Sequence, residues 1–194
     1  GVYPADAEHL APVLRKTQLL KRLVEDLRTL ALADAGELKL HPATLDLGRL
    51  VQRAVQDFTV RAQAFDVTLV SDVPDQPTRT EADAGRIEQV LSILLDNALR
   101  HTPAGGQIHV KLRSIHNEVQ VCVRDTGQGI PPEALPHVFE RFYRASTAAS
   151  SPDGSGLGLS IAQAIVQAHG GRIWVKSQLE QGTTMCFALP LAQA

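Results

Sequence analysis

Four short blocks in the second half of the chain combine polar side chains and glycines at spacings that could bind a ligand. They are Asp96–His101, Asp125–Ile130, Phe139–Arg144 and Gly154–Leu159. The amide oxygen of Asn97 suits a magnesium ion, and the carboxylate of Asp125 suits the amino group of a purine base. Glycines let backbone N–H groups approach phosphate oxygens without side-chain interference. Together, the blocks predict a site for ATP.

The order and spacing of these blocks resemble the ATP-binding domain of bacterial sensor histidine kinases. This domain belongs to a superfamily that also holds DNA gyrase, a large heat-shock chaperone and the mismatch-repair ATPase MutL. One glycine block alone would fit an ordinary turn, but four blocks in one order are specific. The resemblance runs from about Leu47 to the last strand and, more weakly, back through the N-terminal helix. It implies a protein-histidine kinase of a two-component system, with ATP and Mg²⁺ as cofactors.

The first block places three functional candidates on one helix face. Asn97, Arg100 and His101 stand at positions i, i+3 and i+4, which share a face of a helix. The resemblance implies that Asn97 binds magnesium, that Arg100 contacts phosphate and that His101 flanks the nucleotide. Arg100 fits equally well as a last-turn cation that complements the helix dipole. His101 also fits a simple helix end.

One position departs from the family pattern. Histidine kinases commonly carry a second Asn four residues before the magnesium ligand, and the related ATPases carry a water-activating Glu there. This chain has Ile93, which cannot hold a metal or a water, so Mg²⁺ would depend on Asn97, the phosphates and water. Two alternatives stay open: a nucleotide-binding regulatory pseudokinase, and a serine-directed protein kinase of the same superfamily.

The second block follows an apolar strand. A carboxylate at Asp125 would accept a hydrogen bond from the adenine amino group, whereas the 6-oxo group of guanine would present acceptor against acceptor. An Asp-Thr-Gly turn is common by itself, but the neighbouring blocks favour the functional interpretation. The resemblance adds Gly127, Gly129 and Ile130 to the nucleotide site.

The third block resembles the segment that anchors a mobile lid in the family. We expect Phe139 and Phe142 in the core, because aromatic side chains at this spacing are usually buried. Arg144, and secondarily Arg141, are expected to reach the γ-phosphate when the lid closes. The small, polar stretch Ala145–Asp153 has the composition of the lid itself.

The fourth block leads directly into a helix expected over Ser160–His169. Its N–H groups and the helix dipole would therefore point at the phosphates. The block lacks the GK[ST] ending of a P-loop, and no strand-first βαβ unit precedes it. The predicted contacts are Gly154, Ser155, Gly156, Leu157, Gly158 and Leu159.

Composition excludes some other classes. A length of 194 residues suits one domain with a short appendage. A net charge of −2, without basic runs interleaved with aromatics, argues against nucleic acid as a partner. No apolar run approaches a bilayer span and no secretory signal is present. We expect a cytoplasmic domain whose full-length protein continues upstream into a sensor region, often anchored in the inner membrane.

The two cysteines carry no metal-binding or redox spacing. Cys122 and Cys186 each lie inside an apolar, strand-like stretch without a CxxC pattern. This context predicts buried, reduced thiols, with metal binding as the weaker alternative.

The N-terminal helix predicted over Asp6–Asp34 has apolar residues at alternating spacings of three and four. This is the seam of a coiled coil or four-helix bundle, although a helix packed on its own domain would also show it. The resemblance implies the second helix of a dimerisation hairpin over residues 1–36 and the ATP-binding domain over 37–194. It also implies a homodimer and a response regulator as partners.

The family's acceptor histidine is not expected in this chain. In the family, an acidic residue follows that histidine and a proline stands five positions after it, whereas Pro12 follows His9 by three. We therefore predict that the chain alone does not autophosphorylate.

The remaining periodicities predict an α+β fold. The resemblance specifies a two-layer α/β sandwich of the Bergerat type, with a mixed, mostly antiparallel sheet and helices on one face. The expected helices are Leu47–Ala64, Ala84–Arg100 and Ser160–His169, and the expected strands are Val67–Val70, Gln107–Ile115, Glu118–Asp125, Arg172–Ser177 and Thr183–Leu189.

Overall fold

The computed structural model describes residues 7–144 and 155–192. The chain divides into two compact units, Gly1–Leu38 and Lys39–Ala194. The first unit contains the long helix α1, Ala7–Asp34. Val24 and Leu27, two apolar residues of this helix at a spacing of three, are 65% and 49% exposed. Within the described residues, no helix combines the length and apolarity that crossing a lipid bilayer requires.

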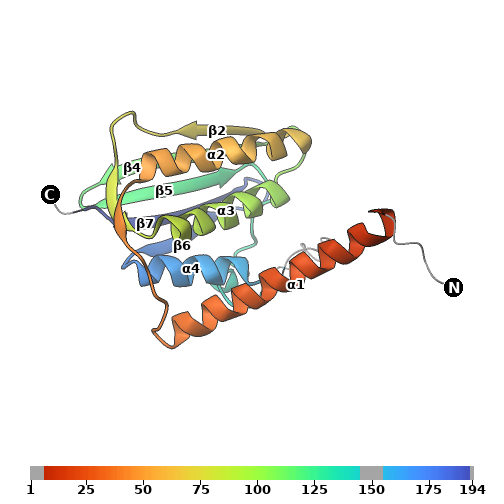
Figure 1. Ribbon diagram of the computed structural model, residues 1–194. Coiled ribbons are helices and arrows are strands. Elements are labelled where there is room, and N and C mark those ends of the chain that lie inside the picture. Colours follow the sequence, from red (N-terminus) through yellow and green to blue (C-terminus); the bar gives the residue numbers. More distant parts are fainter. Residues whose placement is uncertain (1–6, 145–154, 193–194) are drawn as a thin grey trace. The chain divides into compact units, whose positions relative to one another are not determined.

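The second unit is built on a five-stranded sheet of order β2-β4-β5-β7-β6 (Figure 1). β2 pairs with β4 in parallel, and the other pairs are antiparallel. The helices α2, α3 and α4 cover one face (Figure 1). The strands are β2 (Thr68–Asp72), β4 (Gln107–Ile115), β5 (Glu118–Asp125), β6 (Arg172–Ser177) and β7 (Thr183–Pro190), and the helices are α2 (Leu47–Ala64), α3 (Ala84–His101) and α4 (Gly158–Ala168). The predicted fold is confirmed.

The core lies between this sheet and its helices. Along β5, Val119, Val121 and Val123 are buried while the residues between them are half-buried, as expected for a strand with one face in the core. On α3, Ile87, Leu91 and Leu94 are buried at helical spacing.

Three short elements were not predicted. β1 (Ala43–Asp46) and β3 (Arg79–Ala82) form a separate two-stranded antiparallel sheet, and η1 (Leu135–His137) is a 3-10 turn. Four-residue strands are too short to show a reliable alternation. The side chain of Thr80 in β3 donates a hydrogen bond to the Pro190 carbonyl at 2.7 Å, which fastens the small sheet to β7.

The ends of α3 and α4 are tied together by one histidine. His169, which follows α4, accepts the Asp83 N–H at Nε2 over 3.0 Å, and its Nδ1 lies 2.8 Å from the Ile165 carbonyl oxygen. Asp83 caps α3 by accepting the Arg86 N–H. The two helices that carry candidate site residues are therefore fixed to one another at this end.

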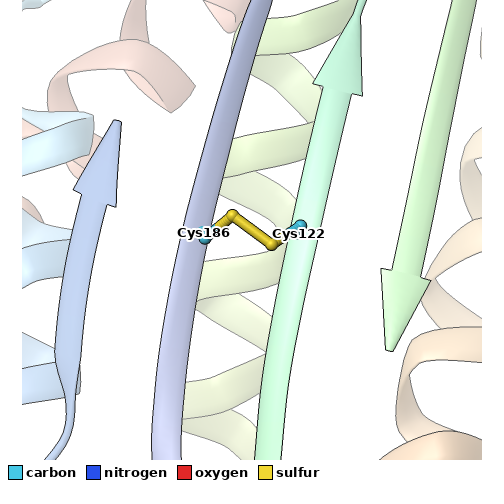
Figure 2. Close-up of a disulfide and its surroundings, with 2 residues drawn as sticks. All are labelled: Cys122 and Cys186. Atoms are coloured by element: carbon cyan, nitrogen blue, oxygen red, sulfur yellow. A yellow bond between two sulfur atoms is a disulfide. The ribbon is translucent and has the colours of Figure 1, made fainter. Parts of the chain in front are cut away.

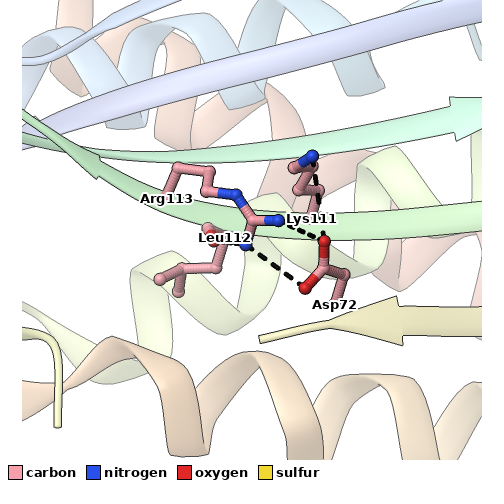
Figure 3. Close-up of polar contacts among 4 residues, drawn as sticks. All are labelled: Asp72, Lys111, Leu112 and Arg113. Carbon is pink, nitrogen blue, oxygen red and sulfur yellow. Dashed lines mark hydrogen bonds and ion pairs between the residues drawn. The ribbon is translucent and has the colours of Figure 1, made fainter. Parts of the chain in front are cut away.

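An ion-pair cluster fastens the parallel edge strand β2 to β4 (Figure 3). Asp72 accepts hydrogen bonds from Arg113 and lies 3.8 Å from Lys111 Nζ. The bond from Arg113 holds the pKa of Asp72 below its usual value.

The two cysteines form a disulfide between β5 and β7 (Figure 2). The predicted burial is confirmed for Cys186, which is 4% exposed, but the prediction of reduced thiols was wrong. Cys122 stands directly opposite Cys186 in the strand register, with their Cα atoms 4.1 Å apart, and such close pairs occur where two strands do not exchange hydrogen bonds. The sequence did not reveal this register. The bridge joins residues 64 positions apart, a loop for which a chain-entropy model gives about 4 kcal/mol of stabilisation.

Candidate functional site

Asp125 lies at the buried end of β5 and is 4% exposed. Its Oδ1 accepts the N–H of Gly127 at 2.8 Å and the N–H of Thr183 at 3.1 Å. None of the other described residues donates a hydrogen bond to Oδ2. Within the described residues, every fully buried side-chain oxygen has a hydrogen-bond partner. Oδ2 therefore keeps contact with solvent and can accept a further donor. Burial raises the pKa of Asp125, against the opposing effects of the N–H groups of Gly127, Thr183 and Asp125 itself and of His101.

His101 is the last residue of α3 and interacts electrostatically with Asp125. Burial lowers the pKa of His101 below its usual value, the charge of Asp125 acts to raise it, and Arg100 acts to lower it. The imidazole is thus neutral at neutral pH. Of the predicted helix-face residues, His101 is therefore one whose charge is coupled to that of the Asp125 carboxylate.

Asn97 and Ile93 occupy successive turns of α3. Asn97 is half-buried, and its Nδ2 donates a weak hydrogen bond to Met185 Sδ at 3.8 Å. Ile93 lies against the start of α4, because its Cγ2 is 3.3 Å from the point that a Cβ at Gly158 would occupy. Arg100 is exposed, whereas Asn97 and His101 on the same face are half-buried.

The loop after β5 is held against the connection between β6 and β7. The Ile130 N–H donates to Ser177 Oγ at 2.8 Å, and the Glu180 N–H donates to the Gln128 carbonyl at 2.7 Å. Gly127 and Gly129 lie in this loop. The carboxylate of Asp125 and the glycines that follow it are thus fixed by two strands and one turn.

The expectation that Phe142 lies in the core was wrong. Phe142 is 64% exposed, with φ at 60°, while Phe139 is half-buried and Val138 carries the burial instead. The chain after η1 forms turns rather than a helix. The spacing of three between Phe139 and Phe142 therefore does not place both side chains on one buried face. Arg141 and Arg144 are exposed, and their contact with the γ-phosphate stays a prediction.

The third and fourth blocks meet at Gly156. The Phe142 N–H donates to the Gly156 carbonyl at 2.9 Å. Gly156 has φ at +71°, and a Cβ there would lie 2.8 Å from Phe142 Cα, so the close approach requires glycine. Gly154 and the predicted lid Ala145–Asp153 lie outside the described residues.

The start of α4 carries the rest of the fourth block. Ser155 Oγ accepts the Leu157 N–H at 3.2 Å, and Leu157 is buried. Among the residues that the structure describes, no side chain caps the helix that begins at Gly158, so with respect to these residues the first-turn N–H groups, including that of Leu159, are available to an anion. The helix starts two residues before the predicted Ser160.

Three residues of the site were missed in the sequence. Thr183 donates its N–H to Asp125, Ser177 accepts the Ile130 N–H, and Met185 contacts Asn97. Gly182, which directly precedes Thr183, is the only sequence signal near these three positions, and it indicates a turn rather than a site.

Comparison with known proteins decides the family. Residues 82–193 match the sequence profile described as Histidine kinase-, DNA gyrase B-, and HSP90-like ATPase. The chain belongs to this family. Its ATP-binding domain is of the kind found in sensor histidine kinases, which confirms the predicted family and fold.

Individual relatives of this ATPase-family chain are sensor kinases. It is 37% identical to the adaptive-response sensory kinase SasA of Synechococcus elongatus, over 89% of this chain and 44% of the relative. It is 36% identical to the alginate biosynthesis sensor protein KinB of Pseudomonas aeruginosa, over 97% of this chain and 32% of the relative. The chain thus spans about a third to a half of these curated relatives.

Solved structures give the same result for this ATPase-family domain. The Acinetobacter baumannii histidine kinase AdeS matches with a TM-score of 0.82 and 27% identity, covering 100% of this chain and 89% of AdeS. Full-length ShkA, solved in complex with AMPPNP, matches with a TM-score of 0.83 and 29% identity, covering 100% of this chain and 41% of ShkA.

Proposed function

We propose that Lys39–Ala194 binds ATP with Mg²⁺ and donates the γ-phosphoryl group to a histidine within a sensor histidine kinase. The observation that carries the proposal is the arrangement of Asp125. Two backbone N–H groups hold its Oδ1, and Oδ2 stays available. The adenine 6-amino group can donate a hydrogen bond to Oδ2, whereas the 6-oxo group of guanine is itself an acceptor.

The uncapped start of α4 supports a phosphate site. The N–H groups at Gly158 and Leu159 would bind phosphate oxygens, with the helix dipole behind them. The Leu157 N–H is already bound by Ser155 Oγ, so we assign Leu157 to packing. Arg144, Arg141 and Arg100 would offset charge on the phosphates.

The surroundings of Asn97 fit a magnesium ligand. Its Nδ2 is directed to Met185, so the amide oxygen is left to bind a cation. Within the described residues, no three His, Cys, Asp or Glu side chains cluster as a metal site. The proposed metal would be held by one amide, the phosphates and water. When bound, Mg²⁺ would neutralise charge on the phosphates.

The recipient of the phosphoryl group would lie on a hairpin that pairs with α1. We propose that α1 is the second helix of this hairpin, that the acceptor histidine lies on the first, and that two copies dimerise through it. A response regulator would receive the group next. ThkA, which matches with a TM-score of 0.74 at 23% identity, was solved in complex with the response regulator protein TrrA.

A regulatory pseudokinase is the second candidate, and the position of Ile93 favours it. The apolar side chain of Ile93 occupies the α3 turn before Asn97 and lies against Gly158. A second metal-binding amide is therefore absent from this turn.

Two experiments test these proposals. ATP is first titrated with and without Mg²⁺ into the wild type, Asn97→Ala and the exposed control Asn117→Ala. We expect Asn97→Ala alone to lose the Mg²⁺-dependent part of the affinity, and an unchanged Asn97→Ala would contradict the metal assignment. Labelled ATP is then supplied to the chain together with the complete hairpin, in which α1 is paired with the proposed first helix that carries the acceptor histidine. Label on the hairpin histidine supports the kinase, whereas intact ATP binding without transfer favours the pseudokinase.

A further inference from the structure

The Cys122–Cys186 bridge lies on the face of the sheet opposite the helices. Val121 and Val123 flank Cys122 on β5 and are buried in the core, and successive side chains of a strand point to opposite faces. Cys122 therefore points to the other face, where Lys111 is its neighbour on β4. The bridge spans the gap between β5 and β7 (Figure 2).

This face is accessible around the bridge. Cys122 is half-buried, and Lys111, Arg124 and Lys176 on the same face are exposed. Cations near a cysteine favour its thiolate form, and they also attract an incoming thiolate. Cys186 is only 4% exposed, so the accessible sulfur is that of Cys122.

The two bridged strands also hold the carboxylate of Asp125. Asp125 follows Cys122 by three residues on β5, and Thr183 precedes Cys186 by three on β7. The Thr183 N–H donates to Asp125 Oδ1 at 3.1 Å. A Cβ at Gly182 would lie 2.0 Å from the Asp125 carbonyl oxygen. Separation of the two strands at this end would therefore displace the carboxylate.

We propose that Cys122 and Cys186 form a reversible thiol–disulfide site that takes a dithiol reductant, and that the bridged form binds ATP more tightly than the reduced form. The inference rests on the proposed function, because it acts through the adenine contact of Asp125. The bridge holds β5 to β7 near that carboxylate. After reduction, only hydrogen bonds and packing hold the strands there.

The exchange proceeds in two steps. A thiolate of the reductant attacks Cys122 Sγ, forms a mixed disulfide and breaks the bond to Cys186, which leaves as a thiolate and takes a proton from solvent. The second thiol of the reductant then attacks the first reductant sulfur, which is bonded to Cys122 Sγ in the mixed disulfide. This step closes the disulfide of the reductant and releases Cys122 as a thiol. The protein disulfide gains two electrons and two protons, and the dithiol becomes a disulfide.

The test measures thiols and ATP affinity in the same samples. The air-oxidised chain is compared before and after dithiothreitol, with maleimide labelling to count thiols and titration with Mg²⁺-ATP. We expect no reactive thiol before reduction and both after it, with ATP affinity falling about fivefold, at the lower end of coupling between protein sites. The Cys122→Ser/Cys186→Ser variant should show the reduced affinity and no response to dithiothreitol.

Gln120→Ser, on the same face of β5, is the matched control and should respond to dithiothreitol as the wild type does. Two reactive thiols before reduction would overturn the bridge. Equal ATP affinity in both redox states of the wild type would overturn the coupling alone. Absence of ATP binding in both states would overturn the proposed function, and this inference with it.

Discussion

Ile93 of α3 lies against the first residue of α4, with its Cγ2 3.3 Å from the point that a Cβ at Gly158 would occupy. The Asn97 side chain stands one turn further along the same helix. An amide at position 93 would therefore add an oxygen ligand near Asn97 and near the end of α4 that we propose to bind phosphate.

We predict that Ile93→Asn strengthens the Mg²⁺ dependence of ATP binding, because a second amide oxygen joins the metal site. The loss of apolar contacts should lower the unfolding free energy by about 1–2 kcal/mol. Calorimetric titration with and without Mg²⁺ measures the first effect, and Ile93→Val controls for packing. An Ile93→Asn variant with wild-type Mg²⁺ dependence would argue against a metal near this turn.

We predict that Asp125→Asn lowers ATP affinity by roughly 1.5–3 kcal/mol, the range for hydrogen bonds to charged groups. The amide oxygen can still accept from Gly127 and Thr183, so the fold should be retained. An NH₂ group would then face the adenine amino group, donor against donor. Asp72→Asn, on the other face of the sheet, controls for the loss of charge. Unchanged affinity in folded Asp125→Asn would remove Asp125 from the base site.

The pH dependence of stability should also report on Asp125. Burial raises the pKa of Asp125 in the folded chain above the ordinary 3.8 of the unfolded chain. Between the unfolded-state pKa and the folded-state pKa, the native chain holds a proton that the unfolded chain has lost. The unfolding free energy of the wild type should therefore fall as pH rises through this window. Asp125→Asn lacks the effect, so its stability relative to wild type should increase across the window and then level off. Denaturant unfolding from pH 3.5 to 7 measures it, and a constant difference would contradict the burial effect.

Gly156→Ala should destabilise the chain by about 1–3 kcal/mol, because the left-handed backbone and the close Phe142 backbone both resist a Cβ. It should also weaken ATP binding, since Gly156 joins the Phe142 segment to the loop before α4. Gly170→Ala is the matched control, with φ at +70° but no atom within 4 Å of the added Cβ. Equal losses in the two variants would mean that backbone strain alone decides the effect. Thermal unfolding and ATP titration separate these outcomes.

Periodicity predicted the elements with a long buried face. The helix Leu47–Ala64 and the strands Gln107–Ile115 and Glu118–Asp125 have the predicted bounds, because an apolar stripe on one face marks them along their whole length. The four-residue strands β1 and β3 lack this signal and were missed.

What the sequence could not supply was the pairing of residues across strands. The contact between Thr183 and Asp125 and the bridge between Cys122 and Cys186 depend on the register of β5 with β7. No local pattern encodes that register. Phe142 was misplaced for a related reason, since its exposure follows from turns that bring it to Gly156.

The position of the disulfide along the chain has a consequence for proteolysis. The connection between β5 and β7 runs from Cys122 to Cys186 and contains α4, β6 and the segment after Arg144. A single peptide-bond cleavage within it leaves two fragments that the bridge still joins. Such nicked chains should migrate as one species in a non-reducing gel and separate only after reduction.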